Sequence, residues 1–158
     1  MNHPKIVNTT KIMHHFSTGT KKMAFTNGCF DLFHAGHAHL LKSIKEDLPD
    51  DYELVVGVNG DESVKQNKGS ERPIISQEQR AFLVACHECV DHVFVFNDPT
   101  VSGYLRHFKP SRWYKGGDYN VATLHPSEKA SCGQTKVSFV PFSEDISATK
   151  IITKIKEL

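Results

Sequence analysis

Two histidines three positions apart, His34 and His37, follow a short apolar run at the point where the spacing of apolar residues becomes helical. Residues three apart lie on the same side of a helical turn, so both imidazole rings can face one ligand. The first turn of a helix also presents free backbone N–H groups and a partial positive charge, which favour an anion. Gly36, between the two rings, lets a bulky ligand approach the backbone closely. Together these features predict a phosphate-binding site.

The histidine pair has two other interpretations. Two imidazoles can bind zinc, but a structural zinc site needs four ligands. Cys86 and Cys89 could supply the remaining two, yet they fall inside an amphipathic stretch and no second CxxC matches them. We therefore predict no metal site in the protein itself. The second alternative is that both histidines are plain structural residues.

The segments that must position this motif alternate between strands and helices. Short apolar, often β-branched runs predict five strands, at 23–26, 54–58, 93–96, 113–115 and 136–140. Apolar residues at helical spacing predict helices at 38–44, 77–89, 100–108 and 147–158. Such alternation in a single domain predicts an α/β, Rossmann-like three-layer fold with a five-stranded parallel sheet. Ligands of such sheets bind beyond the carboxyl ends of the strands, where the histidine pair is expected.

Three further segments fall near predicted strand ends. The polar stretch 62–76 predicts a mobile loop, and it carries the cations Lys65, Lys68 and Arg72. Residues 115–117 follow the fourth predicted strand, and their two glycines permit tight backbone contact with a ligand. Ser147 opens the last predicted helix, whose free N–H groups can bind phosphate. The structural alternatives are solvated lysines, a plain turn and a helix cap without a ligand.

With its histidine motif, the sequence resembles the HxGH nucleotidylyltransferases, a family with a cytidylyltransferase-like Rossmann fold. The resemblance covers residues 23–155 and is carried by four blocks in the family's order, TNGCFDLFHAGH (26–37), KQNKGSERP (65–73), KGGDY (115–119) and ISATK (146–150). It implies an enzyme that moves a nucleotidyl group from a nucleoside triphosphate to a phosphorylated sugar or polyol. The family reaction is a direct in-line displacement that releases pyrophosphate and forms no covalent enzyme intermediate.

The same resemblance implies a role for each matching residue. The triphosphate and its transition state are expected to be bound by three catalytic residues, His34, His37 and Lys68. The substrate phosphates are expected to contact Lys65, Arg72 and Arg80. The nucleotide is expected to contact Thr26, Asn27, Cys29, Phe30, Gly36, Lys115, Gly116, Gly117, Asp118, Ser147 and Thr149. Mg²⁺ is expected to arrive with the nucleoside triphosphate rather than in a dedicated protein cage.

Two subfamilies compete for the substrates. The stretches TNGCFD and KGGDY resemble the adenylyltransferases that make ADP-heptose from D-glycero-β-D-manno-heptose 1-phosphate, which favours ATP. Phe142 stands where glycerol-3-phosphate cytidylyltransferases carry an arginine, which also favours the adenylyltransferases. The alternative is a cytidylyltransferase that uses CTP and glycerol 3-phosphate or a related phospho-alcohol. Asp145 replaces a usual glycine and Ala148 a usual Thr or Ser, which removes one hydroxyl contact to phosphate. A non-enzymatic nucleotide-binding protein is the alternative from another class.

Composition limits the remaining possibilities. The chain has 158 residues and a net charge of +1, unlike the strongly basic proteins that bind nucleic acid generally. No apolar run approaches the roughly 18 residues that span a bilayer, so we expect no membrane partner. We expect free thiols, a cytoplasmic location and, on the resemblance, a standalone form that assembles as a homodimer. Residues 1–22 contain lysines but no acid and predict a polar N-terminal arm ahead of the nucleotidylyltransferase domain at 23–158.

Overall fold

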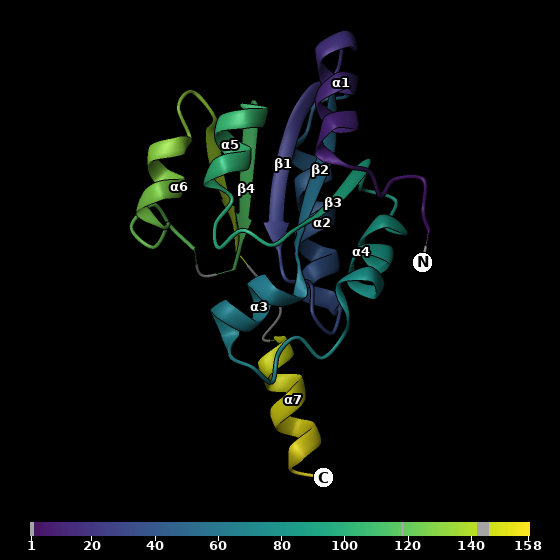
Figure 1. Cartoon of the computed structure of the whole chain (residues 1–158), viewed down its shortest axis with the longest axis vertical. Helices are drawn as coiled ribbons and strands as arrows, with labels where there is room; N and C mark the ends of the chain where they lie inside the picture. Colours follow the sequence, from purple (N-terminus) through teal and green to yellow (C-terminus); the bar gives the residue numbers. More distant parts are fainter. Residues whose placement is uncertain (1, 118, 142–145) are drawn as a thin grey trace.

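The central sheet has five parallel strands in the order β3-β2-β1-β4-β5 (Figure 1). Its strands are β1 (Lys22–Gly28), β2 (Tyr52–Asn59), β3 (His92–Phe96), β4 (Arg112–Gly116) and β5 (Lys136–Val140). The computed structural model describes residues 2–117, 119–141 and 146–158. Because all strands point the same way, their carboxyl ends share one edge of the sheet. The predicted Rossmann-like fold class and its five strands are confirmed.

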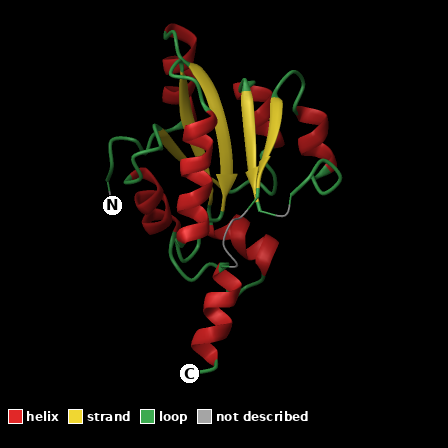
Figure 2. Cartoon of the chain, turned by 180° about the vertical axis from the view of Figure 1, so that it is seen from behind, coloured by secondary structure: helices red, strands yellow, loops and turns green. Residues whose placement is uncertain are grey.

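One face of the sheet is covered by α2 (Ala35–Asp47) and α4 (Gln77–Ala85), seen from behind in Figure 2. Leu41 and Ile44 of α2 are fully buried there, as is Val84 of α4. A fully buried aliphatic side chain of this size stabilises a fold by about 1.5–3 kcal/mol. The continuous apolar run in β2 fits this arrangement, since a strand covered on both faces needs apolar residues on both.

The other face is covered by α1 (Thr9–Thr18) and α5 (Ser102–Phe108), and α6 (Pro126–Ser131) packs against α5. Leu105 of α5 is buried in the same apolar cluster as Phe25 of the central strand. Figure 1 shows α1 and α5 on the near side of the sheet, with α2 behind it.

The N-terminal segment pairs with the edge strand β3, and α1 packs onto this second face, which differs from the expected polar arm at 1–22. Ile6 forms a parallel bridge with Val93, and the backbone N–H of Val7 donates to the Val93 carbonyl at 2.9 Å. Ile12 of α1 is fully buried. The physical reason is that a few well-placed apolar side chains suffice to bury one helix face, although the segment is polar on average.

Residues 62–68, the first part of the expected mobile loop at 62–76, belong to the helix α3 (Asp61–Lys68). Its first turn carries Asp61 and Glu62, and its last turn carries Lys65 and Lys68. This order of charges complements the helix dipole and supports a short helix of otherwise poor propensity. Lys68 therefore stands at the end of a helix, not on a loop.

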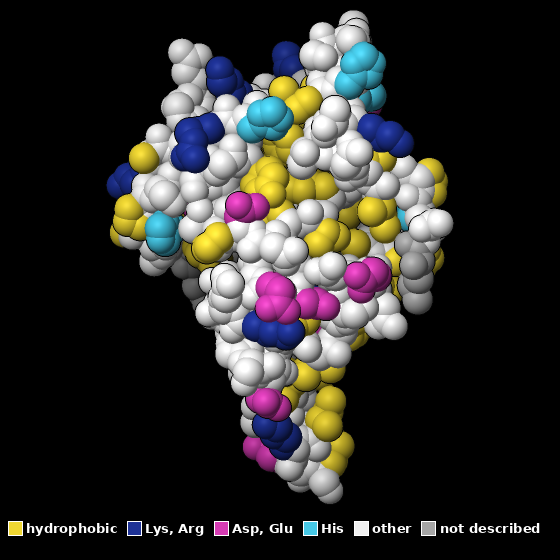
Figure 3. Space-filling view, in the orientation of Figure 1, with side chains coloured by type: hydrophobic (Ala, Val, Ile, Leu, Met, Phe, Trp, Pro, Cys, Tyr) yellow, Lys and Arg dark blue, Asp and Glu magenta, His cyan; other side chains and the backbone are white. Residues whose placement is uncertain are grey.

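The last helix, α7 (Ala148–Lys156), begins at the carboxyl edge of the sheet and projects away from the body (Figure 1). Ser147 caps it, since its side chain accepts a hydrogen bond from the Lys150 N–H at 3.2 Å. Hydrophobic side chains follow one side of this helix in Figure 3, and none of its residues is buried. Across the described residues, every helix is too short or too polar to cross a membrane.

Candidate active site

A cavity of about 570 Å³ opens at the carboxyl edge of the sheet. Its lining combines the segment after β1, the end of α3, the end of β4, residues around α6 and the start of α7. The chain runs outward from β1 to β3 and then crosses to β4 on the other side of β1. The loops diverge at that reversal, which is where open parallel sheets bind ligands.

His34 and His37 line this cavity as a stacked pair, with ring centroids 3.8 Å apart and planes 23° apart. His34 caps α2, and its Nδ1 accepts a hydrogen bond from the Gly36 N–H at 3.2 Å. The Nδ1 of His37 accepts in turn from the His34 N–H at 3.3 Å. Because both Nδ1 atoms accept hydrogen bonds, each neutral ring carries its proton on Nε2. The cap thus fixes the orientation and the tautomer of both rings.

The environment keeps both rings neutral. Burial lowers the pKa of His37 to about 3, with further lowering by the neighbouring His34 and Lys68. Burial also lowers the pKa of His34. Both histidines are therefore uncharged Nε2–H donors at neutral pH when no ligand is bound.

The two lysines of α3 lie differently. Lys68 lines the cavity. Lys65 is absent from the described lining and pairs with Glu62 at 2.8 Å on the exposed face of the helix. Both residues were expected to bind phosphate, and the structure brings only Lys68 to the cavity.

Arg72 lines the cavity, and an ion pair with Asp31 holds its side chain there. The Arg72 Nε donates to Asp31 Oδ2 at 2.8 Å, and the N–H groups of Ile74 and Ile75 also donate to this carboxylate. Burial would raise the pKa of Asp31, but these hydrogen bonds outweigh it and lower the pKa. The Arg72 Nη2 is buried and has no hydrogen-bond partner among the described residues. Arg72 is thus held at the cavity, and the described residues leave one of its buried nitrogens without a hydrogen-bond partner.

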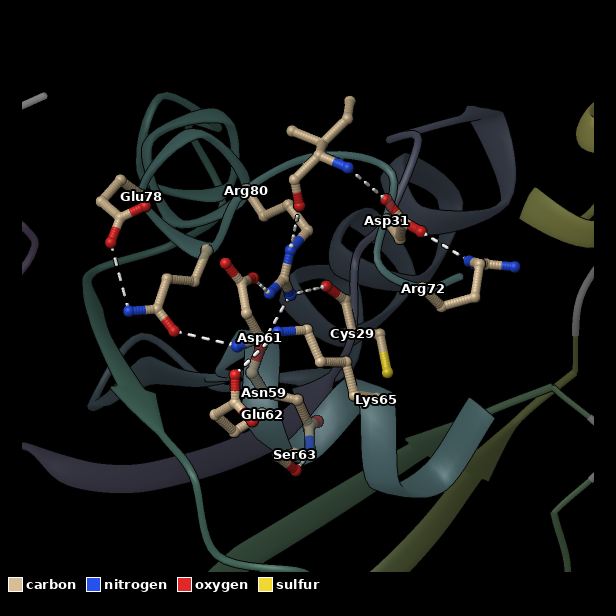
Figure 4. Close-up of polar contacts among 12 residues, drawn as sticks. Cys29, Asp31, Asn59, Asp61, Glu62, Ser63, Lys65, Arg72, Glu78 and Arg80 are labelled. Atoms are coloured by element: carbon tan, nitrogen blue, oxygen red, sulfur yellow. Dashed lines mark hydrogen bonds and ion pairs between the residues drawn. The ribbon is translucent and has the colours of Figure 1, made fainter. Parts of the chain in front are cut away.

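Arg80, expected to bind substrate, is instead a buried structural residue (Figure 4). Its Nε donates to the Ile75 carbonyl at 2.8 Å, and its Nη1 donates to the carbonyls of Cys29 and Asn59. Its Nη2 pairs with Asp61 at 2.7 Å. The side chain is fully buried and does not line the cavity. The structure thus does not bring Arg80 to the cavity, because carbonyls just after β1 and at the end of β2 occupy its guanidinium.

Thr26 also proves structural. It is fully buried, and its hydroxyl donates to the Tyr114 carbonyl at 2.9 Å, which ties β1 to β4. The other nucleotide-binding predictions divide into three groups. The cavity lining includes Asn27, Cys29, Phe30, Lys115, Gly116, Ser147 and Thr149. Gly36 and Gly117 adjoin that lining in the sequence without being part of it. Outside the described residues lie Asp118, Phe142 and Asp145.

The end of β4 holds an ammonium group among aromatic rings. The Lys115 Nζ lies 5.1 Å from the Trp113 ring centroid and 4.7 Å from that of Tyr119. It also lies 3.9 Å from Glu128 Oε2. Burial lowers the pKa of Lys115 even so. Tyr119 and Glu128 line the cavity, and neither was predicted as a site residue. Tyr119 stands inside the KGGDY block and could have been included, whereas no pattern in the sequence points to Glu128.

A sequence model of the cytidylyltransferase-like family matches residues 25–154. The chain belongs to the cytidylyltransferase-like family. The resemblance drawn from the four motif blocks is therefore confirmed.

Curated relatives agree with this family. The Bifunctional protein HldE of Helicobacter acinonychis (strain Sheeba) is 40% identical over 154 residues, which is 98% of this chain and 32% of that protein. The Bifunctional protein HldE of Geobacter sulfurreducens is 39% identical over 137 residues, or 85% of this chain and 27% of that protein. The chain thus spans about a third of the length of these relatives, or less. Family and relatives together support a nucleotidyltransferase.

Two solved structures share the fold. A lipopolysaccharide core biosynthesis protein from Thermoplasma volcanium is 30% identical, with a TM-score of 0.61 over 79% of this chain and 98% of that one. A macrolide-efflux protein from Streptococcus pneumoniae has a TM-score of 0.63 over 95% of this chain and 56% of that one, at 18% identity. The second likeness concerns the fold alone.

Proposed function

We propose that this chain transfers an adenylyl group from ATP to a phosphorylated sugar, with heptose 1-phosphate as the acceptor, and releases pyrophosphate. The observation that carries the proposal is the capped pair His34 and His37, which offers two neutral Nε2–H donors beside a helix N-terminus. Donors fixed before the reaction stabilise charge on phosphoryl oxygens without reorganising as that charge develops.

The proposed reaction needs no nucleophile from the protein. An oxygen of the acceptor phosphate forms a bond to the α-phosphorus of ATP, and the bond from that phosphorus to the oxygen bridging to the β-phosphorus breaks. Pyrophosphate leaves with the electron pair. The acceptor phosphate is already an anion, so the protein's task is to align the reactants and stabilise the transition state.

Two cations complete the proposed phosphate site. Lys68 lines the cavity at the end of α3, and its charge already acts on His37. Arg72 lines the cavity, and its buried Nη2 has no hydrogen-bond partner among the described residues; an unmet donor of this kind costs about 1–3 kcal/mol. A phosphate oxygen would satisfy that donor. We assign both residues to the phosphates of the donor or the acceptor.

The nucleoside is assigned to the end of β4. Gly116 lines the cavity, and a Cβ at this position would lie 2.8 Å from a methyl carbon of Leu40. A larger residue would have to displace the Leu40 side chain, whereas glycine leaves the backbone open to a base or ribose. The ring of Tyr119 adds an aromatic surface at the same end of the cavity.

Magnesium is proposed to enter as part of the nucleotide complex. Asp31 is the buried carboxylate beside the histidine motif, and both of its oxygens already accept hydrogen bonds. It does not fit as a free metal ligand, so the phosphate oxygens and water would hold the ion. When bound, Mg²⁺ neutralises charge on the phosphates.

The choice of a sugar acceptor rests on relatives rather than on geometry. The HldE proteins match nearly the whole chain, and the solved Thermoplasma volcanium protein is named for lipopolysaccharide core biosynthesis. Glycerol 3-phosphate with CTP is the competing pair of substrates.

The test crosses ATP or CTP with heptose 1-phosphate or glycerol 3-phosphate and measures pyrophosphate release. The proposal predicts release with ATP and heptose 1-phosphate alone, and release at least about 100-fold slower by the His34→Ala variant under the same conditions. Release only with CTP and glycerol 3-phosphate would overturn the substrates and keep the reaction. Nucleotide binding with no release in any combination would favour a nucleotide-binding protein instead.

A further inference from the structure

Three metal-ligating side chains converge at the amino-terminal edge of the sheet, opposite the cavity. They are His15 of α1, Glu53 near the start of β2 and His92 at the start of β3. The Nε2 atoms of His15 and His92 lie 2.6 Å and 3.0 Å from the same Glu53 Oε2. Ligand atoms of the three residues all lie within 4.8 Å of one another. Across the described residues, no other group of three such side chains meets this spacing.

The fold places these residues together by strand periodicity. Alternate residues of a strand share a face, so Glu53 and His92 point to the same side as Val55 and Phe94, two positions further on. Both of those residues are buried in one cluster with Ile12 of α1. His15 follows Ile12 by about one helical turn and therefore lies on the same side of α1. The side chains of His15, Glu53 and His92 thus meet at the rim of the apolar cluster that α1 covers.

The site is enclosed on one side and open on the other. The exposed fractions are 42% for the His15 side chain, 21% for Glu53 and 20% for His92. The ring of Phe16 stands edge-on to both imidazoles, with centroid distances of 5.0 Å and 5.8 Å. A cation can therefore enter from solvent, while an apolar wall fixes the orientation of the rings. Figure 3 shows histidine side chains at this end of the molecule.

Two imidazole nitrogens and a carboxylate oxygen form a zinc donor set, and the fourth position is open to water. Magnesium prefers oxygen ligands and does not match this set. In a tetrahedral zinc site with bonds of about 2.0 Å, ligand atoms lie about 3.3 Å apart. To reach that spacing from the Glu53 oxygen, the His15 nitrogen would need to move outward by about 0.7 Å and the His92 nitrogen by about 0.3 Å.

We propose that His15, Glu53 and His92 bind one Zn²⁺ ion that pins α1 to the amino-terminal edge of the sheet. The competing arrangement has no metal, and in it both imidazoles simply donate Nε2–H bonds to the carboxylate. A zinc site would bind one metal ion per chain and give a Co²⁺ absorption band, whereas the hydrogen-bonded triad would do neither, so an experiment can distinguish them.

The experiment titrates the purified full chain with Zn²⁺ by calorimetry and with Co²⁺ by visible absorption. We expect one equivalent of either ion to bind. The bound Co²⁺ should show the intense visible absorption of tetrahedral coordination. Zn²⁺ should raise the melting temperature of the protein. The variants His15→Gln and His92→Gln keep a hydrogen-bond donor to Glu53 but remove a ligand. Each should weaken binding by at least about 100-fold, since losing even an outer-shell partner costs 10- to 100-fold.

The matched control is His14→Ala, which removes an exposed imidazole of the same helix and should bind metal like the wild type. The variant His34→Ala should also bind like the wild type, which separates this site from the cavity. A second measurement on the unmutated chain follows the histidine ring resonances, and those of His15 and His92 should shift on adding Zn²⁺. No bound equivalent, or equal binding by both glutamine variants and the wild type, would overturn the proposal.

Discussion

The molecule carries a histidine pair at each end of its sheet, and the two pairs differ in what their ring nitrogens contact. At the carboxyl end, the Nδ1 atoms of His34 and His37 accept from backbone N–H groups, and no carboxylate among the described residues is hydrogen-bonded to either ring. At the amino end, His15 and His92 share the Glu53 carboxylate. At the carboxyl end, the proposed role of the histidines is to donate hydrogen bonds to a phosphate that binds there. At the amino end, the histidines are hydrogen-bonded to the carboxylate of Glu53.

The chemistry of a histidine pair is therefore set by its neighbours. The cavity pair has a lowered pKa and faces Lys68, so it favours a ligand that brings negative charge. The other pair faces the carboxylate of Glu53, and ligand atoms of the three residues lie close enough together for the proposed Zn²⁺ ion. The spacing of the histidines in the sequence does not show which pair would bind an anion and which a cation.

The largest expected difference between the two histidine pairs is the effect of their variants on enzymatic activity. Replacing His34 or His37 by Ala removes a transition-state donor and should reduce kcat at least about 100-fold in a pyrophosphate-release assay. His15→Gln should leave kcat within about twofold, because its ring lies at the opposite edge of the sheet. Nucleotide affinity, measured separately, reports whether the loss lies in binding or in chemistry. Near-wild-type turnover by both alanine variants would contradict the claim that the cavity pair acts in the reaction.

A smaller effect distinguishes two lysines of one helix at the cavity end. Lys68→Met should lower kcat/KM by about 10- to 100-fold, the equivalent of losing one hydrogen bond to a charged group, about 1.5–3 kcal/mol. Lys65→Met is the control and should change kcat/KM less than about twofold, since Lys65 pairs with Glu62 away from the cavity. Steady-state kinetics with each substrate varied measures both. Equal losses would mean that α3 acts through its overall charge.

The smallest effect concerns stability and pH. The folded-state pKa of His37 is about 3, below its ordinary value of 6.5, so the unfolded chain takes up a proton first as the pH falls. His37 alone should therefore reduce the free energy of unfolding by about 1 kcal/mol between pH 7 and pH 5.5, at about 1.4 kcal/mol per pH unit below 6.5. The Glu53 contribution should persist through that window and disappear only at lower pH, since its pKa is lowered from 4.5.

Urea unfolding of the ligand-free protein at several pH values measures these contributions. The variant His37→Asn keeps an acceptor for the His34 N–H and should flatten the curve between pH 7 and pH 5.5. An unchanged slope in that variant would show that His37 titrates normally in the folded state.

Much of the fold could be predicted because its strands contain short apolar runs. A strand buried on both faces leaves a run such as 54–58, which is too short for a helix and carries β-branched residues throughout most of its length. The helices α1, α3 and α6 were not predicted. They are short and largely polar, and their stability comes from caps, dipole-matched charges and a few buried side chains such as Ile12.

The site could be predicted in part for a similar reason. The histidine cap is local, so its residues lie together in the sequence. Arg72 and Arg80 look alike in the sequence, but one reaches the cavity and the other is held by carbonyls of β1 and β2. Glu128 reaches Lys115 only through the packing of α6. Contacts between distant segments leave no local pattern from which they could be predicted.

Direct nucleotidyl transfer at the cavity can be tested in a single turnover. The enzyme, in excess over ATP, is mixed with ATP alone or with ATP and heptose 1-phosphate, quenched, and assayed for pyrophosphate and sugar nucleotide. Direct transfer predicts no pyrophosphate from ATP alone, and equal amounts of pyrophosphate and sugar nucleotide when the acceptor is present. A stoichiometric burst of pyrophosphate from ATP alone, leaving the nucleotide attached to the protein, would contradict it.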